Sequence, residues 1–444
     1  MTAQAPEDKA ELLEKIRQQF DSAPYPRAAL DESPKDDINS LYIHNLVTPY
    51  YLRNQKVIDT KGKIILDAGC GSGWKSMSLA LANPGAKIVG IDISAESVKL
   101  AQQRLQYHGV EDAEFHALSL EDLPKLGMEF DYINCDELLY LFPNPSQALQ
   151  AMKKVLKPEG IIRSNLHCKF ERQAFFRVQE IFRMMGLMNE NPRELEIEIA
   201  VETIKALHNN VPLKVQAWNP SFEGEDKEEN ILMNYLFQGD KGYSIRDMFA
   251  AIQDAGLEFT KMVRWLQWEL MNLFKEPDNL PAFLAMSLPE LSEEERLYLF
   301  QLLNPKHRLL DFWCGHPDVA APLAPLGEWN SDDWENATVH LHPQLRTPNF
   351  RQSLINSVTE MKPFVISEFL SLDGSYTSID SSKALCVVPL LEKPQAMKIL
   401  VERWRQVRPL DPVTLKYTEY KQTFNETQRL ITGLESLGYV MVER

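Results

Sequence analysis

The stretch IILDAGCGSGW, residues 64–74, decides the fold, because it runs from an apolar strand through a tight turn into a helix. Asp67 ends the strand, and Gly69, Gly71 and Gly73 allow backbone positions that a Cβ atom would forbid. A ligand can then lie against bare main chain, with the N–H groups of the helix start turned toward its polar end. We therefore predict a ligand-binding loop here.

An acidic residue follows at the spacing that ribose recognition requires. Asp92 ends the segment KIVGID, nineteen residues after Gly73, where a carboxylate can accept hydrogen bonds from a ribose diol. The dinucleotide pattern G-x-G-x-x-G is absent, because Trp74 and Ser76 stand where its last glycine would fall. The ligand is therefore expected to carry a ribose without being a dinucleotide.

Outward from this loop, short apolar runs alternate with helical patterns. The predicted strands are KIILDAGC (63–70), KIVGIDIS (87–94), AEFHALSL (113–120), FDYINCDE (130–137) and GIIRSNLH (160–167). Near-continuous apolar strands separated by helices are typical of a parallel sheet covered on both faces. The pattern predicts an α/β fold.

Residues 63–168 resemble the class I S-adenosylmethionine-dependent methyltransferases. The resemblance rests on LDAGCGSG (66–73), on VGIDIS (89–94), on EFHALSLEDLP (114–124) and on VLKPEG (155–160). It implies a doubly wound, mostly parallel Rossmann-like methyltransferase sheet with S-adenosyl-L-methionine as cofactor. Ser119 stands where the family usually has Asp, so the backbone at 118–120 rather than this side chain is expected to contact the cofactor. The cofactor-binding positions that we predict are Asp67, Gly69, Gly71, Gly73, Asp92, Ile93, Ser119, Leu120 and Asp136.

Candidate catalytic residues come from the carboxyl ends of strands, where open α/β sheets bind their ligands. They are Glu137 and Tyr140 after the fourth strand, His167 in the fifth, and Tyr25 in an N-terminal Pro-rich segment. A base is needed only if the attacked atom must lose a proton. Structural roles compete with each assignment: Glu137 can bind a loop amide, Tyr140 can pack in the core, and Tyr25 can serve as an apolar clamp.

The chain divides into two predicted domains. Residues 1–275 form the methyltransferase domain, with an N-terminal lid and a helical insertion near 170–240. Residues 276–444 form an α+β domain for acceptor recognition or regulation.

Composition excludes several function classes. The 444 residues include 47 Lys and Arg against 63 Asp and Glu, and the resulting net charge of -16 disfavours nucleic acid as a partner. Five scattered Cys disfavour a disulfide framework, and no apolar run reaches the roughly 18 residues of a membrane span. A cytoplasmic setting is expected. No metal is expected, because Cys314, His316, His340 and His342 lack the usual ligand spacing. The sequence leaves the oligomeric state open.

The expected activity is methyl transfer to a nucleophilic acceptor. A minimal small-molecule methyltransferase needs far less chain, so the extra half favours a large acceptor such as a protein side chain. An asparagine amide of a phycobiliprotein is one such acceptor. The alternatives are a small-molecule methyltransferase with a closed pocket under its lid, and a non-catalytic module that senses the cofactor.

Overall fold

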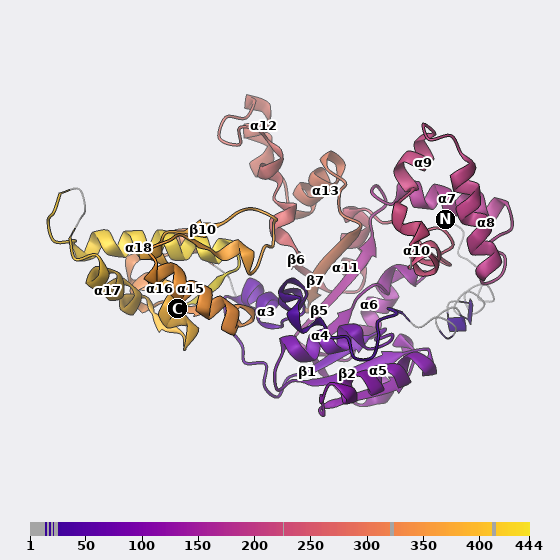
Figure 1. The fold of residues 1–444 in the computed structure, drawn as a ribbon, viewed down its shortest axis with the longest axis horizontal. Coiled ribbons are helices and arrows are strands. Elements are labelled where there is room, and N and C mark those ends of the chain that lie inside the picture. Colours follow the sequence, from indigo (N-terminus) through magenta and orange to yellow (C-terminus); the bar gives the residue numbers. More distant parts are fainter. Residues whose placement is uncertain are drawn as a thin grey trace.

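The computed structural model describes residues 14–15, 17–18, 21, 25–224, 226–319, 324–410 and 414–444. Its centre is a seven-stranded sheet of order β3-β2-β1-β4-β5-β7-β6 (Figure 1). The strands are β1 (Ile64–Ala68), β2 (Lys87–Asp92), β3 (Ala113–Ala117), β4 (Phe130–Cys135), β5 (Leu156–His167), β6 (Glu258–Met262) and β7 (Leu309–Gly315). The first five pair in parallel, and β7 runs antiparallel to both of its neighbours. The predicted α/β fold with a mostly parallel sheet is confirmed.

Helices cover both faces of this sheet. The helices around it are α2 (Ile38–Ile43), α3 (Val47–Asn54), α4 (Trp74–Ala82), α5 (Ala95–Tyr107), α6 (Pro145–Lys153), α11 (Ile245–Asp254) and α13 (Glu293–Leu303). Neighbouring strand residues serve opposite faces: Ile65 packs in the same core as α4 and α5, whereas Leu66 packs with α6 and α11. This alternation follows from the two-residue period of a strand, and it explains why the strands are apolar throughout.

A helical lobe interrupts the domain after β5. It contains α7 (Gln173–Met184), α8 (Glu194–Ala206), α9 (Pro212–Ala217) and α10 (Lys227–Asn234), and it has an apolar core of its own. We call these residues, 173–234, the insertion lobe. In Figure 1 the lobe stands at one end of the molecule, beyond the sheet. It lies where the sequence predicts a helical insertion.

The C-terminal part forms a second α+β unit at the opposite end (Figure 1). Its strands are β8 (Thr338–Leu341), β9 (Phe364–Val365), β10 (Ser378–Ile379), β11 (Gln395–Ala396) and β12 (Val440–Glu443). Its helices are α14 (Ser331–Asn336), α15 (Pro348–Thr359), α16 (Ser381–Val387), α17 (Met397–Val407) and α18 (Tyr420–Ser436). The core of this unit is continuous with the core on the α4–α5 face of the sheet.

The main sheet extends past residue 275, where the sequence places the domain boundary. Strand β7 lies between β5 and β6, so residues 309–315 complete the first domain. The short helix α12 (Ala282–Ser287) and α13 connect β6 to β7. The sequence pattern does not reveal that residues 309–315 belong to the first domain, because β7 comes late in the chain and inserts between β5 and β6, which precede it in sequence. The sheet itself puts the boundary after Gly315.

Helix α13 begins with a side-chain cap. Ser292 accepts a hydrogen bond from the backbone N–H of Glu295, and the Glu295 carboxylate accepts one from the backbone N–H of Ser292. Ser292 and Glu295 thus form a capping box at the start of α13. Among the described residues, no helix combines the length and the apolar character that crossing a membrane requires.

Candidate functional site

The glycine loop is tied to the end of β2. The N–H groups of Gly69 and Cys70 donate to the Ile91 carbonyl at 2.8 and 2.9 Å, and the Gly71 N–H donates to Asp92 Oδ2 at 3.0 Å. Gly71 has a φ of 50°, and a Cβ atom there would lie 2.3 Å from the Tyr25 carbonyl oxygen. Only glycine therefore lets the N-terminal segment approach the loop this closely.

A cavity of 840 Å³ opens beside this loop, within the range of about 300–1,000 Å³ that is usual for ligand pockets. Seven of the predicted cofactor-binding residues line it: Gly69, Gly71, Asp92, Ile93, Ser119, Leu120 and Asp136. Asp67 and Gly73 do not belong to its lining. A Cβ atom at Gly73 would lie 2.6 Å from Ala101 Cα, so Gly73 permits close packing of the loop on α5.

Asp67 is buried behind the loop. Its carboxylate accepts hydrogen bonds from Ser76 Oγ at 2.5 Å and from Asn134 Nδ2 at 2.9 Å. Burial raises its pKa to about 6. These contacts give Asp67 a structural role in joining β1, β4 and α4.

One ion pair lies on the wall of the cavity. Lys75 Nζ is 3.2 Å from Asp136 Oδ2. Burial alone would raise the pKa of Asp136, but the positive charges of Arg163 and Lys75 outweigh it and hold this pKa well below its usual range. An adjacent cation and anion complement the two charges of an α-amino acid group.

The N-terminal segment from Tyr25 to Glu32 is held on the rim of the cavity. Ser72 donates to it twice, from its N–H to the Tyr25 carbonyl at 3.0 Å and from Oγ to the Pro26 carbonyl at 2.7 Å. The Arg104 guanidinium donates to the carbonyls of Ala28 and Ala29, each at 2.7 Å. The described part of the predicted lid is thus fastened to the glycine loop and α5.

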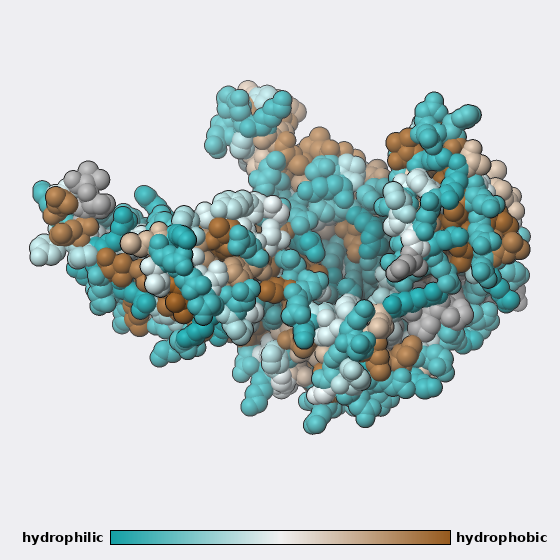
Figure 2. Space-filling model, in the orientation of Figure 1, coloured by the Kyte–Doolittle hydropathy of each residue, from teal (hydrophilic) through white to brown (hydrophobic). Residues whose placement is uncertain are grey.

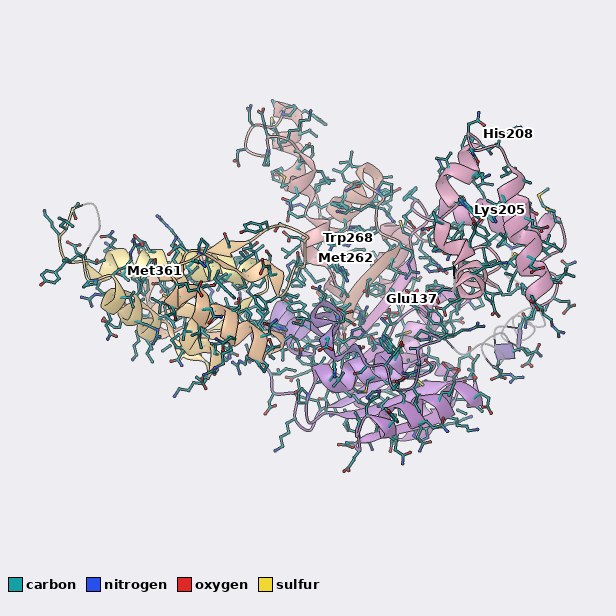
Figure 3. The ribbon with its side chains drawn as sticks, viewed as in Figure 1. Glu137, Lys205, His208, Met262, Trp268 and Met361 are labelled. Atoms are coloured by element: carbon teal, nitrogen blue, oxygen red, sulfur yellow. The ribbon has the colours of Figure 1, made fainter. Side chains whose placement is uncertain are left out.

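A second cavity of 160 Å³ adjoins the first. Four residues line both cavities: Tyr25, Glu137, Glu229 and Met233. The small cavity is completed by Tyr140, His167, Asn230, Asn234 and Arg308. All four predicted catalytic residues, Tyr25, Glu137, Tyr140 and His167, therefore meet around one space. Figure 3 shows the labelled Glu137 near the junction of the sheet and the insertion lobe, with Lys205 and His208 farther out in the lobe.

Glu137 is the anionic centre of the small cavity. It accepts a hydrogen bond from Tyr140 Oη at 3.0 Å and pairs with the Arg308 guanidinium through both carboxylate oxygens. Burial would raise its pKa, but His167 and Arg308 outweigh that effect and hold it at about 2. Its backbone N–H donates to Asn165 Oδ1 at 2.9 Å, so Asn165 on β5 fixes the loop after β4.

His167 is buried at the end of β5. Its Nδ1 lies 2.5 Å from Asp240 Oδ1, and its ring stacks on Tyr140 with centroids 3.7 Å apart. Its Nε2 lies 3.2 Å from Arg308 Nη1. Burial raises the pKa of Tyr25 to about 12, and burial together with Glu137 raises that of Tyr140 well above its usual value. Both phenols therefore stay protonated at neutral pH.

Sequence reasoning missed three charged residues of the site. Lys75 follows the glycine loop directly and lies in the first turn of α4. This position at a helix start beside the loop was the signal that could have identified it as a ligand-binding residue. Asp240 lies in the loop after the insertion lobe, and Arg308 lies past the predicted boundary at residue 275. No local pattern marks Asp240 or Arg308, because each reaches the site only through the tertiary fold.

The four residues considered for a metal are not assembled into a site. His340 pairs with Glu443 at 2.8 Å, His342 contacts Thr48 Oγ1 at 2.9 Å, and His316 contacts the Leu156 carbonyl. Within the described ranges, no three His, Cys, Asp or Glu side chains come close enough together to hold a metal ion.

Several known proteins resemble part of this chain. Residues 59–235 match the family model of a methyltransferase domain. A Ubiquinone biosynthesis O-methyltransferase of Paracidovorax citrulli is 35% identical over 101 residues, which are 22% of this chain and 42% of that protein. An Actinobacillus pleuropneumoniae protein of the same name is 30% identical over 134 residues, 29% of this chain and 56% of its own length. The chain thus spans about half the length of these two relatives.

Two comparisons cover more of the chain. An uncharacterized Synechococcus sp. protein, syc1184_c, is 27% identical over 315 residues, 71% of this chain and 73% of its own. The structure of PKMT2 from Rickettsia typhi in complex with AdoHcy superposes with a TM-score of 0.56 at 16% identity, over 94% of this chain and 77% of that one. At this identity the likeness shows a shared fold. The glycine loop, the sheet order and the matched family model together show that this chain contains a methyltransferase domain, matched over residues 59–235, with the class I fold of S-adenosylmethionine-dependent methyltransferases.

Proposed function

We propose that this enzyme methylates a side-chain nitrogen of an acceptor protein. The observation that carries the proposal is the small cavity, which adjoins the cofactor cavity and shares Tyr25, Glu137, Glu229 and Met233 with it. Its 160 Å³ suit one amino-acid side chain better than a substituted ring with a tail. An asparagine amide of a phycobiliprotein falls within the proposed class.

The chemistry of the large cavity fits the cofactor. Asp92 lines this cavity, and its carboxylate can accept hydrogen bonds from ribose hydroxyls. Lys75 and Asp136 can bind the carboxylate and the ammonium of the amino-acid end, and the apolar walls near Leu120 and Phe142 can hold the adenine. When bound, S-adenosylmethionine supplies a methyl group that its sulfonium already activates.

The polar lining of the small cavity favours a nitrogen acceptor. The carboxylates of Glu137 and Glu229 and the amide oxygens of Asn230 and Asn234 can accept N–H bonds from it. Fixing the acceptor in this lining and excluding water are the main contributions that a protein can make to such a transfer.

One side chain of the cavity is suited to take the proton. Tyr25 and Tyr140 stay protonated because their pKa values are raised, and Glu137 is a weak base because its pKa is about 2. His167 remains, with an imidazole of the kind that serves most often as a general base near neutral pH. We assign the proton to His167 Nε2.

A small-molecule acceptor is the second candidate. Its support is that two relatives are Ubiquinone biosynthesis O-methyltransferases. Those matches cover only 29% and 22% of this chain, so they carry less weight for the acceptor than the geometry of the small cavity.

The test uses the full chain with tritiated-methyl S-adenosylmethionine and cell lysate. Label in protein bands, abolished in His167→Gln, supports the proposal, and amino-acid analysis of a labelled band identifies the methylated atom. Label confined to the small-molecule fraction would refute it. Asp92→Ala is the cofactor control and should weaken cofactor binding in isothermal titration.

A further inference from the structure

The orientation of the His167 ring is set from outside the strand that carries it. Its Nδ1 lies 2.5 Å from Asp240 Oδ1, in the loop after the insertion lobe. Both side chains are buried, and Tyr140 stacks on the imidazole at an interplanar angle of 15°. The ring can therefore neither tilt nor swing away from the small cavity.

Asp240 and Arg308, the two groups within hydrogen-bond distance of the imidazole nitrogens, agree on where its proton sits, while Glu137 Oε2 lies farther from Nε2, at 3.7 Å. An ionised carboxylate only accepts hydrogen bonds, so Asp240 requires a proton on Nδ1. A guanidinium only donates, so Arg308 Nη1, 3.2 Å from Nε2, requires a lone pair there. Together they select the neutral imidazole whose Nε2 lone pair accepts from Arg308 at the edge of the small cavity. The Arg308 side chain is 46% exposed, and it has to turn aside before an acceptor N–H can reach that lone pair.

Two further donors keep the Asp240 carboxylate ionised and in place. Arg172 Nη2 and Gln179 Nε2, both from the insertion lobe or its edge, donate to Asp240 Oδ2 at 2.8 and 2.9 Å. Burial would raise the pKa of Asp240, but the contacts with His167 and Arg172 outweigh it and hold the pKa at about 2. The carboxylate is therefore charged at neutral pH.

We propose that Asp240 is a positioning residue that fixes the tautomer of His167, and that the insertion lobe supplies this control through Arg172 and Gln179. The inference rests on the proposed function, in which His167 Nε2 accepts the proton of the acceptor. The proton leaves the acceptor nitrogen for Nε2, the Nδ1 proton stays in its bond to Asp240, and the carboxylate balances the charge of the imidazolium that forms.

The structure indicates what Asp240→Asn would do. The new amide has one oxygen and one NH₂ group, and three donors surround it: Arg172, Gln179 and the His167 Nδ1 proton. If its oxygen faced His167, its NH₂ would oppose two buried donors. If its oxygen faces Arg172 and Gln179, its NH₂ donates to Nδ1, and the imidazole proton moves to Nε2.

The second arrangement is the less costly one. Arg172 and Gln179 are buried, whereas the Arg308 side chain is 46% exposed and can turn to water when Nε2 becomes a donor. Asp240→Asn therefore leaves the shape of the site intact and removes the lone pair that the proton needs.

The experiment compares the full-length wild type, Asp240→Asn and Gln179→Leu. Histidine ¹⁵N NMR assigned by His167→Gln should show a protonated Nδ1 in the wild type and a protonated Nε2 in Asp240→Asn. Transfer of labelled methyl into lysate protein should fall at least about 100-fold in Asp240→Asn, at an unchanged KM for S-adenosylmethionine. Its residual rate should rise in proportion to hydroxide concentration, because no side chain then takes the proton.

Gln179→Leu is the matched control. It removes one hydrogen bond from the same carboxylate but leaves Arg172 and the charge of Asp240, so its tautomer should be that of the wild type and its rate should fall less than about tenfold. An equal loss in both variants, or an unchanged tautomer in Asp240→Asn, would overturn the positioning role. Absence of label from protein in the wild type would refute the proposed acceptor instead, because the NMR result does not depend on the acceptor.

Discussion

Replacing Asp67 by Asn should make the protein more stable at neutral pH. Asp67 is a fully buried carboxyl at the end of β1, and it accepts one hydrogen bond from Ser76 and one from Asn134. Asn is of the same size. Its amide oxygen can keep the bond from Asn134, and its NH₂ group can donate to Ser76 Oγ, so the substitution removes the charge and keeps the contacts.

The magnitude follows from the shifted pKa. Burial raises the pKa of Asp67 from 3.8 to about 6. The folded state thus holds this proton more tightly than the unfolded chain does, and stability is lost as pH rises from 3.8 through 6. A shift of about two units corresponds to at most about 3 kcal/mol at pH 7, since each unit is 1.36 kcal/mol. Asp67→Asn should therefore gain about 1–3 kcal/mol at pH 7.5 and about a third of that at pH 4.5.

Asp131→Asn is the matched control, because its pKa is displaced in the opposite direction. Burial would raise that pKa, but hydrogen bonds from Lys157, the Ile64 N–H and Lys63 outweigh it and lower it. This contribution to stability is present above the unfolded pKa and lost as pH falls through the folded one. Asp131→Asn should therefore destabilise, and more so at pH 7.5 than at acid pH.

Urea denaturation followed by circular dichroism at pH 4.5, 6 and 7.5 measures both variants. A destabilised Asp67→Asn at pH 7.5, or a gain that does not change with pH, would refute the reasoning. Asp67 does not line the large cavity. The affinity of the Asp67→Asn variant for S-adenosylmethionine, measured by isothermal titration, should therefore stay within about threefold of the wild-type value.

Three further substitutions test other parts of the structure. Arg163→Met leaves Asp136 and Asp311 buried without their shared partner, and should lower the free energy of unfolding by about 3–5 kcal/mol in urea denaturation. Arg104→Met removes the hydrogen bonds to the carbonyls of the N-terminal segment. It should weaken S-adenosylmethionine binding in isothermal titration and speed proteolysis of that segment. An unchanged affinity would show that the segment does not contribute to cofactor binding. Ser292→Ala removes the cap of α13 and should lower the thermal midpoint by an amount equivalent to about 1 kcal/mol, without changing cofactor affinity.

The lining of the large cavity was largely predictable because its signals are local. Gly69, Gly71 and Asp92 lie at the ends of two neighbouring strands, and the strand–turn–helix pattern puts them on one edge of the sheet. Asp67 and Gly73 belong to the same pattern, yet they support the loop from behind. A linear pattern shows that a residue belongs to the loop, and only the packing shows which side of the loop it serves.

The acceptor side was predictable only in part. Tyr140 and His167 could be inferred from strand ends, but Asp240 and Arg308 could not, since their contacts join positions 73 and 141 residues from His167. The boundary near residue 275 failed for the same reason, because β7 enters the sheet after a long excursion of the chain.

The two cavities therefore depend on the chain in different ways. The large cavity is built mainly from the ends of consecutive strands and from the loops that follow them. The small cavity draws on the N-terminal segment, β5, the insertion lobe and Arg308. Figure 2 shows the surface hollowed between the insertion lobe and the arm that carries α12. A protein acceptor would have to enter between such projections, so exchanging the insertion lobe should change the acceptor.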